Sequence, residues 1–317
     1  MEFCDTPEPF ELRKEGLFFK PANVYIDPRR PVQNALISHA HADHSSNGIQ
    51  QAWATPETLS LIKLRLGKRA PLLNHGIKYH QPFNLSEGTQ VTFLPAGHML
   101  GSAMILIQHN DTRYLYTGDF KLTSDPTCEK ADIVPCDVLF TEVTFGAVKY
   151  SHPEPEAEIR KLHSYLPGRL VISCYKQGKS QRITRMIHEL DPEIQLMVHP
   201  EIVQYHKCYE SLGVDLGSWE QYNRRTFLNS TSAVLIAPPS RAIGFTTYPG
   251  VVVAKATGWK RFIPKMGFHL HISDHVDIDE MMHFIDRSQA KKIVTFHGDD
   301  KELKFRVAAR AQLKLNF

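Results

Sequence analysis

The sequence predicts a two-part α/β protein, in which a layered domain of sheets and helices is interrupted by a smaller α/β insert. Three observations lead to this prediction. Residues 17–37 alternate short apolar runs with turns, which is typical of early strands. Residues 151–249 alternate helix and strand patterns, which indicates βα units and a parallel sheet. After residue 250 strand patterns resume, and a last helix pattern covers residues 301–313. We therefore expect one domain from residues 1–150 and 250–317, and an insert from 151–249.

The elements of the first part follow from apolar runs bounded by turn residues. A helix is predicted over residues 55–65, because Thr55-Pro-Glu supplies a cap with proline in the first turn. Asn110-Asp111 marks a turn between two strands. The predicted strands cover residues 17–19, 24–26, 32–37, 91–94, 103–108, 113–116 and 138–140.

The insert begins after Ser151-His-Pro-Glu-Pro-Glu156, where two prolines and several charges mark a linker or a helix start. Its predicted helices cover residues 156–166, 180–190 and 202–212. Its predicted strands cover residues 170–173, 195–198 and 233–236.

The composition is that of an ordinary globular protein. Of the 317 residues, 42% are hydrophobic and 22% charged, and no apolar run approaches the roughly 18 residues that span a bilayer. The five cysteines include no Cys-x-x-Cys pair, and the first residues lack the pattern of a signal peptide. We therefore expect reduced thiols in a cytoplasmic protein without a membrane partner.

The segment Leu36-Ile-Ser-His-Ala-His-Ala-Asp-His-Ser45 places imidazoles and a carboxylate directly after a predicted strand. These are ligand types that zinc and neighbouring metals accept. His39 and His41 are two apart and project to one side of an extended backbone. Asp43 and His44 follow on the turn and can serve a second ion. The pattern predicts a site for divalent metal ions.

The alternative is a histidine-rich polar loop, since the chain has 17 histidines. Three further ligand-type residues argue against it, because each follows a predicted strand and lies beside a glycine. These residues are His98, Asp119 and His297.

The run His39-Ala-His-Ala-Asp-His44, followed by Gly97-His98 and Gly118-Asp119, resembles the signature of metallo-β-lactamase-fold hydrolases. The resemblance implies an αββα sandwich and a pair of divalent ions, zinc in the first place and manganese as an alternative. It also implies the ligand set. One ion is held by His39, His41 and His98, the second by Asp43, His44 and His297, and Asp119 bridges both. Asp27 resembles the early aspartate that orients the ligands, and we count Asp27 and Asp43 with the catalytic residues.

Later motifs resemble the β-CASP nuclease branch of this family. They are Thr141-Glu142-Val-Thr-Phe-Gly146, Ile272-Ser-Asp-His275-Val-Asp277 and Val294-Thr-Phe-His297-Gly298. Within the branch, the chain is most similar to bacterial ligase-associated DNA exonucleases, which are also grouped with messenger-RNA 3′-end processing factors. The insert is shorter than in the large RNA-processing members.

These features predict a two-metal nuclease. His275 is the candidate general acid for the leaving alkoxide, and Glu142 orients it and keeps it protonated. The favoured function is a DNA exonuclease in DNA repair, with nucleic acid as the partner and a functional association with a DNA ligase and a helicase. The alternatives are an RNA 3′-end processing enzyme, a small-molecule hydrolase of the same fold, and a non-catalytic scaffold.

Lys179 and Arg182 open a predicted helix, and we expect them to bind a substrate phosphate at its N-terminus. Simple capping of that helix by Ser180 is the alternative. A nucleotide-binding P-loop is disfavoured, because Ser173 stands where that motif needs its first glycine.

Overall fold

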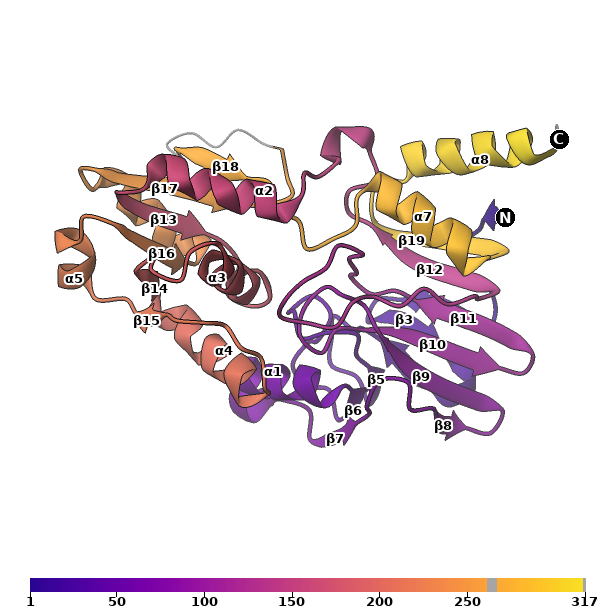
Figure 1. Cartoon of the computed structure of the whole chain (residues 1–317). Coiled ribbons are helices and arrows are strands. Elements are labelled where there is room, and N and C mark those ends of the chain that lie inside the picture. The colour runs from indigo at the N-terminus through magenta and orange to yellow at the C-terminus, as the bar shows by residue number, and fades with distance from the viewer. Residues whose placement is uncertain (261–266, 316–317) are drawn as a thin grey trace. The chain divides into compact units, whose positions relative to one another are not determined.

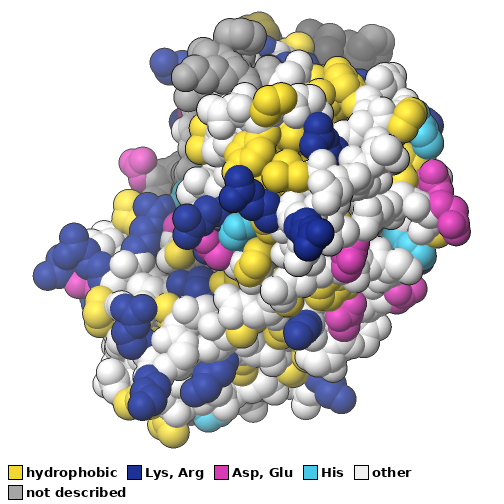
Figure 2. All heavy atoms as spheres, turned by 90° about the vertical axis from the view of Figure 1, so that its left-hand side faces the viewer, with side chains coloured by type: hydrophobic (Ala, Val, Ile, Leu, Met, Phe, Trp, Pro, Cys, Tyr) yellow, Lys and Arg dark blue, Asp and Glu magenta, His cyan; other side chains and the backbone are white. Residues whose placement is uncertain are grey.

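The computed structural model describes residues 1–260 and 267–315. The chain forms two compact units (Figure 1). The first unit comprises Met1–Ser124, Glu129–Ser151 and His275–Phe317, and the second comprises Asp125–Cys128 and His152–Asp274. None of the described helices is long and apolar enough to cross a bilayer. Figure 2 shows one face of the molecule, over which Lys and Arg side chains are widely spread.

The first unit contains two mixed sheets. The seven-stranded sheet has the order β1-β19-β12-β11-β10-β9-β8, and the six-stranded sheet has the order β2-β3-β4-β5-β6-β7. The strands of the larger sheet are β1 (Glu2–Phe3), β8 (Phe83–Ser86), β9 (Thr89–Pro95), β10 (Ala103–His109), β11 (Thr112–Tyr116), β12 (Val138–Val143) and β19 (Lys292–Gly298). Those of the smaller sheet are β2 (Phe10–Arg13), β3 (Gly16–Phe19), β4 (Val24–Ile26), β5 (Asn34–Leu36), β6 (Gln51–Ala54) and β7 (Leu73–Gly76).

Alternating side chains of the seven-stranded sheet feed two cores. Val91 and Phe93 of β9 pack with residues of the six-stranded sheet, such as Phe19 and Leu36. Leu94 points to the opposite face, where it joins a core with helices α7 (Ile278–Ser288) and α8 (Lys301–Leu315). This period-two alternation places α7 and α8 on one face of the seven-stranded sheet and the six-stranded sheet on the other, which are three of the layers of the expected αββα sandwich.

Helix α1 (Pro56–Leu66) lies beside β6 and β7 in the first unit (Figure 1). Thr55 caps it, since its side chain accepts a hydrogen bond from the backbone N–H of Thr58 at 3.2 Å. The predicted start of this helix is therefore confirmed.

The second unit is an α/β layer around one parallel sheet, with the order β15-β14-β16-β13-β17-β18. Its strands are β13 (Arg169–Ser173), β14 (Leu196–Val198), β15 (Glu220–Gln221), β16 (Ala233–Ala237), β17 (Val251–Ala256) and β18 (Phe268–Leu270). Its helices are α2 (Pro155–Arg160), α3 (Lys179–Leu190), α4 (Pro200–Ser211), α5 (Arg224–Asn229) and α6 (Pro239–Ala242). Helix–strand alternation in the sequence predicted this arrangement.

The return to the first unit differs from the predicted boundary near residue 250. β17 pairs in parallel with β13, with Val253 opposite Val171, and β18 extends the same sheet. Residues 250–274 therefore belong to the second unit, and the chain re-enters the first unit at His275. The segment Asp125–Cys128 also belongs to the second unit.

Candidate metal centre

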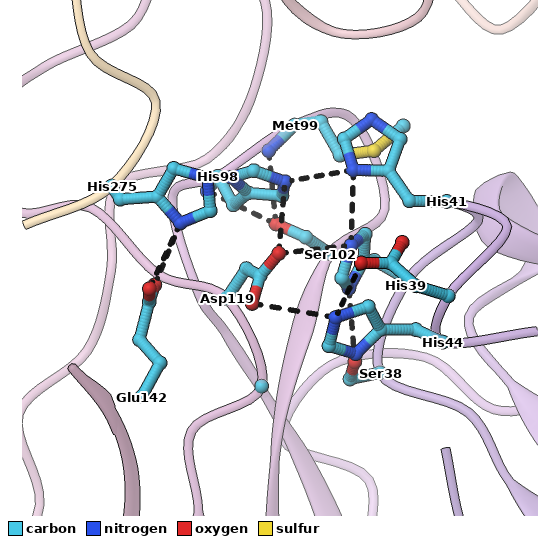
Figure 3. Close-up of polar contacts among 12 residues, drawn as sticks. Ser38, His39, His41, His44, His98, Met99, Ser102, Asp119, Glu142 and His275 are labelled. Atoms are coloured by element: carbon cyan, nitrogen blue, oxygen red, sulfur yellow. Dashed lines mark hydrogen bonds and ion pairs between the residues drawn. The ribbon is translucent and has the colours of Figure 1, made fainter. Parts of the chain in front are cut away.

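The candidate ligands follow strands of the first unit that run in the same direction. β11, β12 and β19 are parallel neighbours, and β4 and β5 are parallel neighbours in the other sheet. Because carboxyl ends of parallel strands meet at one edge of a sheet, the side chains that follow them gather there. Figure 3 shows the resulting cluster, and every residue labelled there belongs to the first unit.

Glycines beside two ligands allow close passage of the backbone. Gly97 and Gly118 have φ of +73° and +56°. A Cβ on Gly97 would lie 2.3 Å from the carbonyl oxygen of Lys121, and one on Gly118 would lie 2.7 Å from Ser38. These turns therefore need glycine to place His98 and Asp119.

His39, His41, His98 and Asp119 form the largest such cluster among the described residues, and one ligand atom from each lies within 4.8 Å of the others. His41 Nδ1 is 3.1 Å from His39 Nε2 and 3.2 Å from His98 Nε2. Asp119 Oδ2 is 3.5 Å from His39 Nε2 and 3.9 Å from His98 Nε2. Nitrogens around a tetrahedral zinc ion are about 3.3 Å apart, given Zn–N bonds of about 2.0–2.1 Å. The donor set therefore fits a metal ion.

His44 is oriented by a buried carboxylate. Its Nδ1 lies 2.7 Å from Asp27 Oδ2, and Nε2 faces Asp119 Oδ1 at 3.4 Å. Asp27 accepts further hydrogen bonds from the Ser38 N–H at 2.7 Å and the Tyr116 hydroxyl at 3.0 Å. The Asp27 carboxylate thus fixes the orientation of the His44 ring.

Asp43 and His297 lie near His44 but are less tightly assembled. Asp43 Oδ2 is 3.8 Å from His44 Nε2, and its side chain is 66% exposed. The His297 ring stacks on His44 with centroids 5.6 Å apart. Within the described part of the chain, neither residue joins a group of three whose ligand atoms lie within 4.8 Å. The Arg29 guanidinium lies against the His297 ring instead.

Glu142 and His275 form a pair at the side of this cluster. His275 Nδ1 is 2.9 Å and 3.0 Å from the two carboxylate oxygens of Glu142, which is fully buried. Glu142 also accepts hydrogen bonds from the Phe120 N–H, at 2.9 Å, and from the Thr144 hydroxyl. Burial raises the pKa of Glu142, but His275 and these donors outweigh it, and the net shift is downward. The carboxylate is therefore charged and holds the ring.

Burial and the neighbouring charges set opposite shifts on two histidines. The pKa of His39 lies well below its usual value, because the ring is buried and His44 and His98 place positive charge around it. Burial also lowers the pKa of His44, but Asp119 and Asp27 reverse this and raise it to about 10. The pKa of Asp119 is raised to about 6 by its burial, against the opposing charge of His44. Without metal, the cluster thus carries a positive charge on His44 that a divalent cation can replace.

Lys179 and Arg182 are not surface residues, contrary to the substrate-binding role predicted for them. They are 4% and 1% exposed inside the second unit. Lys179 Nζ lies 3.3 Å from Asp274 Oδ2. Arg182 donates to the Ser273 carbonyl at 2.7 Å, and its Nε is 3.5 Å from Asp125 Oδ2. Their charges are neutralised internally, so they tie residues 125–128 and 273–274 to α3.

The α3 N-terminus is closed by a different residue from the predicted Ser180. Gln181 Oε1 accepts from the Gly178 N–H at 2.8 Å, whereas the Ser180 hydroxyl donates to the Lys176 carbonyl at 2.7 Å.

Sequence reasoning missed four residues that shape the centre: Ser38, Tyr116, Thr144 and Arg29. The first three lie at or next to strand ends that carry ligands, so that position was the available signal. Arg29 has no such pattern and is revealed only by its contact with His297, which is far away in the sequence.

A family model described as a beta-lactamase superfamily domain matches residues 9–173. The chain belongs to this superfamily. The predicted metallo-β-lactamase fold is thereby confirmed, and this fold implies divalent metal ions at the His/Asp cluster. The relatives described next confirm the relationship to nucleases of this superfamily.

Two relatives of this chain are named as enzymes that act on nucleic acids. The chain is 27% identical over 307 residues to a probable DNA ligase of Opitutus terrae, covering 92% of this chain and 29% of the ligase. It is 25% identical over 210 residues to endoribonuclease YSH1 of Mycosarcoma maydis, covering 54% of this chain and 23% of that protein. The chain thus spans less than a third of either relative.

A solved structure shares the fold. The crystal structure of a protein of unknown function from Enterococcus faecalis matches with a TM-score of 0.63 and 14% identity, over 85% of this chain and 76% of that one.

Proposed function

We propose that this protein is a two-metal-dependent nuclease that hydrolyses phosphodiester bonds. The observation that carries the proposal is the Glu142–His275 pair beside the His/Asp cluster. Phosphodiester hydrolysis needs charge neutralisation at the phosphoryl oxygens and a proton for the leaving alkoxide. A cluster of metal ligands with an oriented histidine at its side supplies both.

His39, His41, His98 and Asp119 would hold one ion, and His44, Asp43 and His297 would join Asp119 around a second. Bound divalent ions, with zinc favoured over manganese, would polarise the phosphoryl group and make water a better nucleophile at neutral pH.

His275 would donate the proton to the leaving oxygen. Glu142 holds Nδ1, so Nε2 is the nitrogen on the other side of the ring that can pass a proton to substrate. The buried carboxylate favours the protonated form of the imidazole through its charge. Asp27 fixes the tautomer of His44 and so contributes indirectly.

DNA is the favoured substrate, and the favoured reaction is exonucleolytic digestion in DNA repair. The likeness to a DNA ligase over 92% of the chain supports this choice and a functional association with a ligase, and we extend that association to a helicase. The spread of Lys and Arg side chains in Figure 2 suits a polyanionic substrate. RNA processing is the second candidate, supported by the likeness to an endoribonuclease over 54% of the chain.

The test uses end-labelled single- and double-stranded DNA and RNA with zinc or manganese. We expect DNA digestion, and His275→Ala should lower its rate about 100-fold or more while metal content stays near two ions per chain. His283→Ala is the matched control, because His283 lies exposed on α7. Full activity of His275→Ala would remove the assigned general acid. Turnover of a chromogenic ester without cleavage of any polynucleotide would favour a small-molecule hydrolase.

A further inference from the structure

Arg29 extends from a rigid turn at the edge of the candidate metal centre. It follows β4 by three residues, after Asp27 and the buried Pro28. The Arg29 N–H donates to the Glu15 carbonyl at 2.8 Å, and the Asp27 N–H donates to the Leu36 carbonyl at 3.0 Å. The same short turn thus fixes the carboxylate that orients His44 and the root of the Arg29 side chain.

The Arg29 guanidinium has a poor partner in this position. Its Nη2 lies 3.0 Å from Nδ1 and 2.8 Å from Nε2 of His297. The lone pairs of these two nitrogens diverge, so one nitrogen cannot donate along both of them. A guanidinium has five N–H donors, whereas an imidazole ring can accept at most one hydrogen bond.

No carboxylate neutralises this arginine. Across residues 1–260 and 267–315, the Arg29 side chain forms no ion pair, although Arg29 is exposed. A fixed positive charge next to a centre built for divalent cations is repelled by those cations, unless an anion lies between them. The arrangement is therefore that of an anion clamp, with metal ligands on one side and a guanidinium on the other.

We propose that Arg29 binds a non-bridging oxygen of the substrate phosphate at the metal centre and so selects phosphodiesters over uncharged esters. The planar fork of a guanidinium can donate to two phosphate oxygens at once. An imidazole ring offers no such pair of acceptors. The inference rests on the proposed nuclease function, because it assigns the contact that recognises the phosphate in that reaction.

The first experiment compares a charged and an uncharged probe on the metal-loaded protein. Arg29→Ala should lower kcat/KM for bis(p-nitrophenyl) phosphate about ten- to a hundredfold, as expected for loss of a charge-assisted hydrogen bond. Any hydrolysis of p-nitrophenyl acetate should stay unchanged. Arg29→Lys should recover part of the loss, since it keeps the charge but not the fork. The control is Arg30→Ala, because Arg30 is exposed and its side chain forms no hydrogen bond or ion pair among the described residues.

The second experiment measures binding without turnover. In a His275→Asn background, fluorescence anisotropy of a labelled oligodeoxynucleotide should show weaker binding for Arg29→Ala. The slope of log Kd against log salt concentration should fall by about 0.7–0.9, which corresponds to one phosphate contact. Metal content, measured by atomic emission, should equal that of the parent.

The outcomes separate the two proposals. If the wild-type protein cleaves polynucleotides and Arg29→Ala matches it in rate and salt slope, the role of Arg29 is refuted while the nuclease function stands. A drop in metal content that accounts for the lost binding would make Arg29 a support of His297 and also overturn the inference. If the wild-type protein cleaves no phosphodiester at all, the function fails first and the inference with it.

Discussion

Replacing Glu142 by glutamine tests whether a buried carboxylate is what makes His275 useful. In the wild-type protein three donors converge on the carboxylate: His275 Nδ1, the Phe120 N–H and the Thr144 hydroxyl. Glutamine has one acceptor oxygen and one NH2 group in place of two acceptor oxygens. The Thr144 hydroxyl can turn and accept a hydrogen bond from the NH2 group, so the Phe120 N–H and His275 Nδ1 must share one uncharged oxygen.

The expected magnitude follows from that geometry. Loss of the charge turns the bond to His275 from a charge-assisted into a neutral one, so we expect Glu142→Gln to destabilise the fold by about 1–3 kcal/mol. Because His275 also loses its orientation and its stabilised charge, the cleavage rate should fall about 100-fold or more. Thr144→Ala is the control, since it removes one donor and leaves the carboxylate on His275.

Urea denaturation and single-turnover cleavage, measured on the same preparations, check both effects. The variant must first be shown to bind metal like the parent, so that the rate reports on His275 alone. A folded, metal-loaded Glu142→Gln protein that cleaves at the wild-type rate would show that His275 does not need the buried carboxylate, whatever the stability of the variant.

Three further predictions concern other parts of the chain. In the second unit, buried His206 accepts a hydrogen bond from Gln181 Nε2 at 3.0 Å, and burial lowers its pKa to about 3. In the unfolded chain the His206 ring binds a proton near pH 6.5, whereas in the folded chain it stays neutral until about pH 3. The free energy of unfolding should therefore fall by on the order of 4 kcal/mol as pH drops from about 6.5 toward 3. Urea titrations at several pH values measure this dependence, and His206→Gln should flatten it. Arg182→Met leaves Asp274 with less compensating charge and should destabilise the second unit by about 3–5 kcal/mol in urea denaturation. A stability equal to that of the wild type would show that the buried ion pairs of Arg182 contribute nothing to folding. Because the pKa of His44 is about 10 without metal, zinc binding near pH 7.5 should release close to one proton from this ring. Calorimetry in buffers of different ionisation enthalpy measures the release, and a heat of zinc binding that does not depend on the buffer would contradict it.

The grouping of His39, His41, His98 and Asp119 could be predicted from the sequence because these candidate ligands carry local signals. His39 to His44 form one continuous run after a strand, and His98 and Asp119 each stand beside a glycine whose turn the structure requires. The α/β alternation of the insert was equally local, since helices and strands differ in their hydrophobic period.

Long-range pairing explains what the sequence did not predict. Whether β17 pairs with a strand of the first unit or of the second depends on β13, which lies far away in the chain. Lys179 and Arg182 look like a helix N-terminal phosphate site until Asp274 and Asp125 are seen to neutralise them. The edge strand β7 is exposed along its whole length and has no apolar alternation to reveal it.

The central claim is that the His/Asp cluster of the first unit binds two divalent ions. An anomalous difference map at the zinc edge, from crystals grown with zinc, tests it most directly. We expect one peak among His39, His41 and His98 and a second beside His44, with Asp119 between them. Crystals grown with zinc that show no peak among these side chains, or peaks only at other places on the chain, would contradict it.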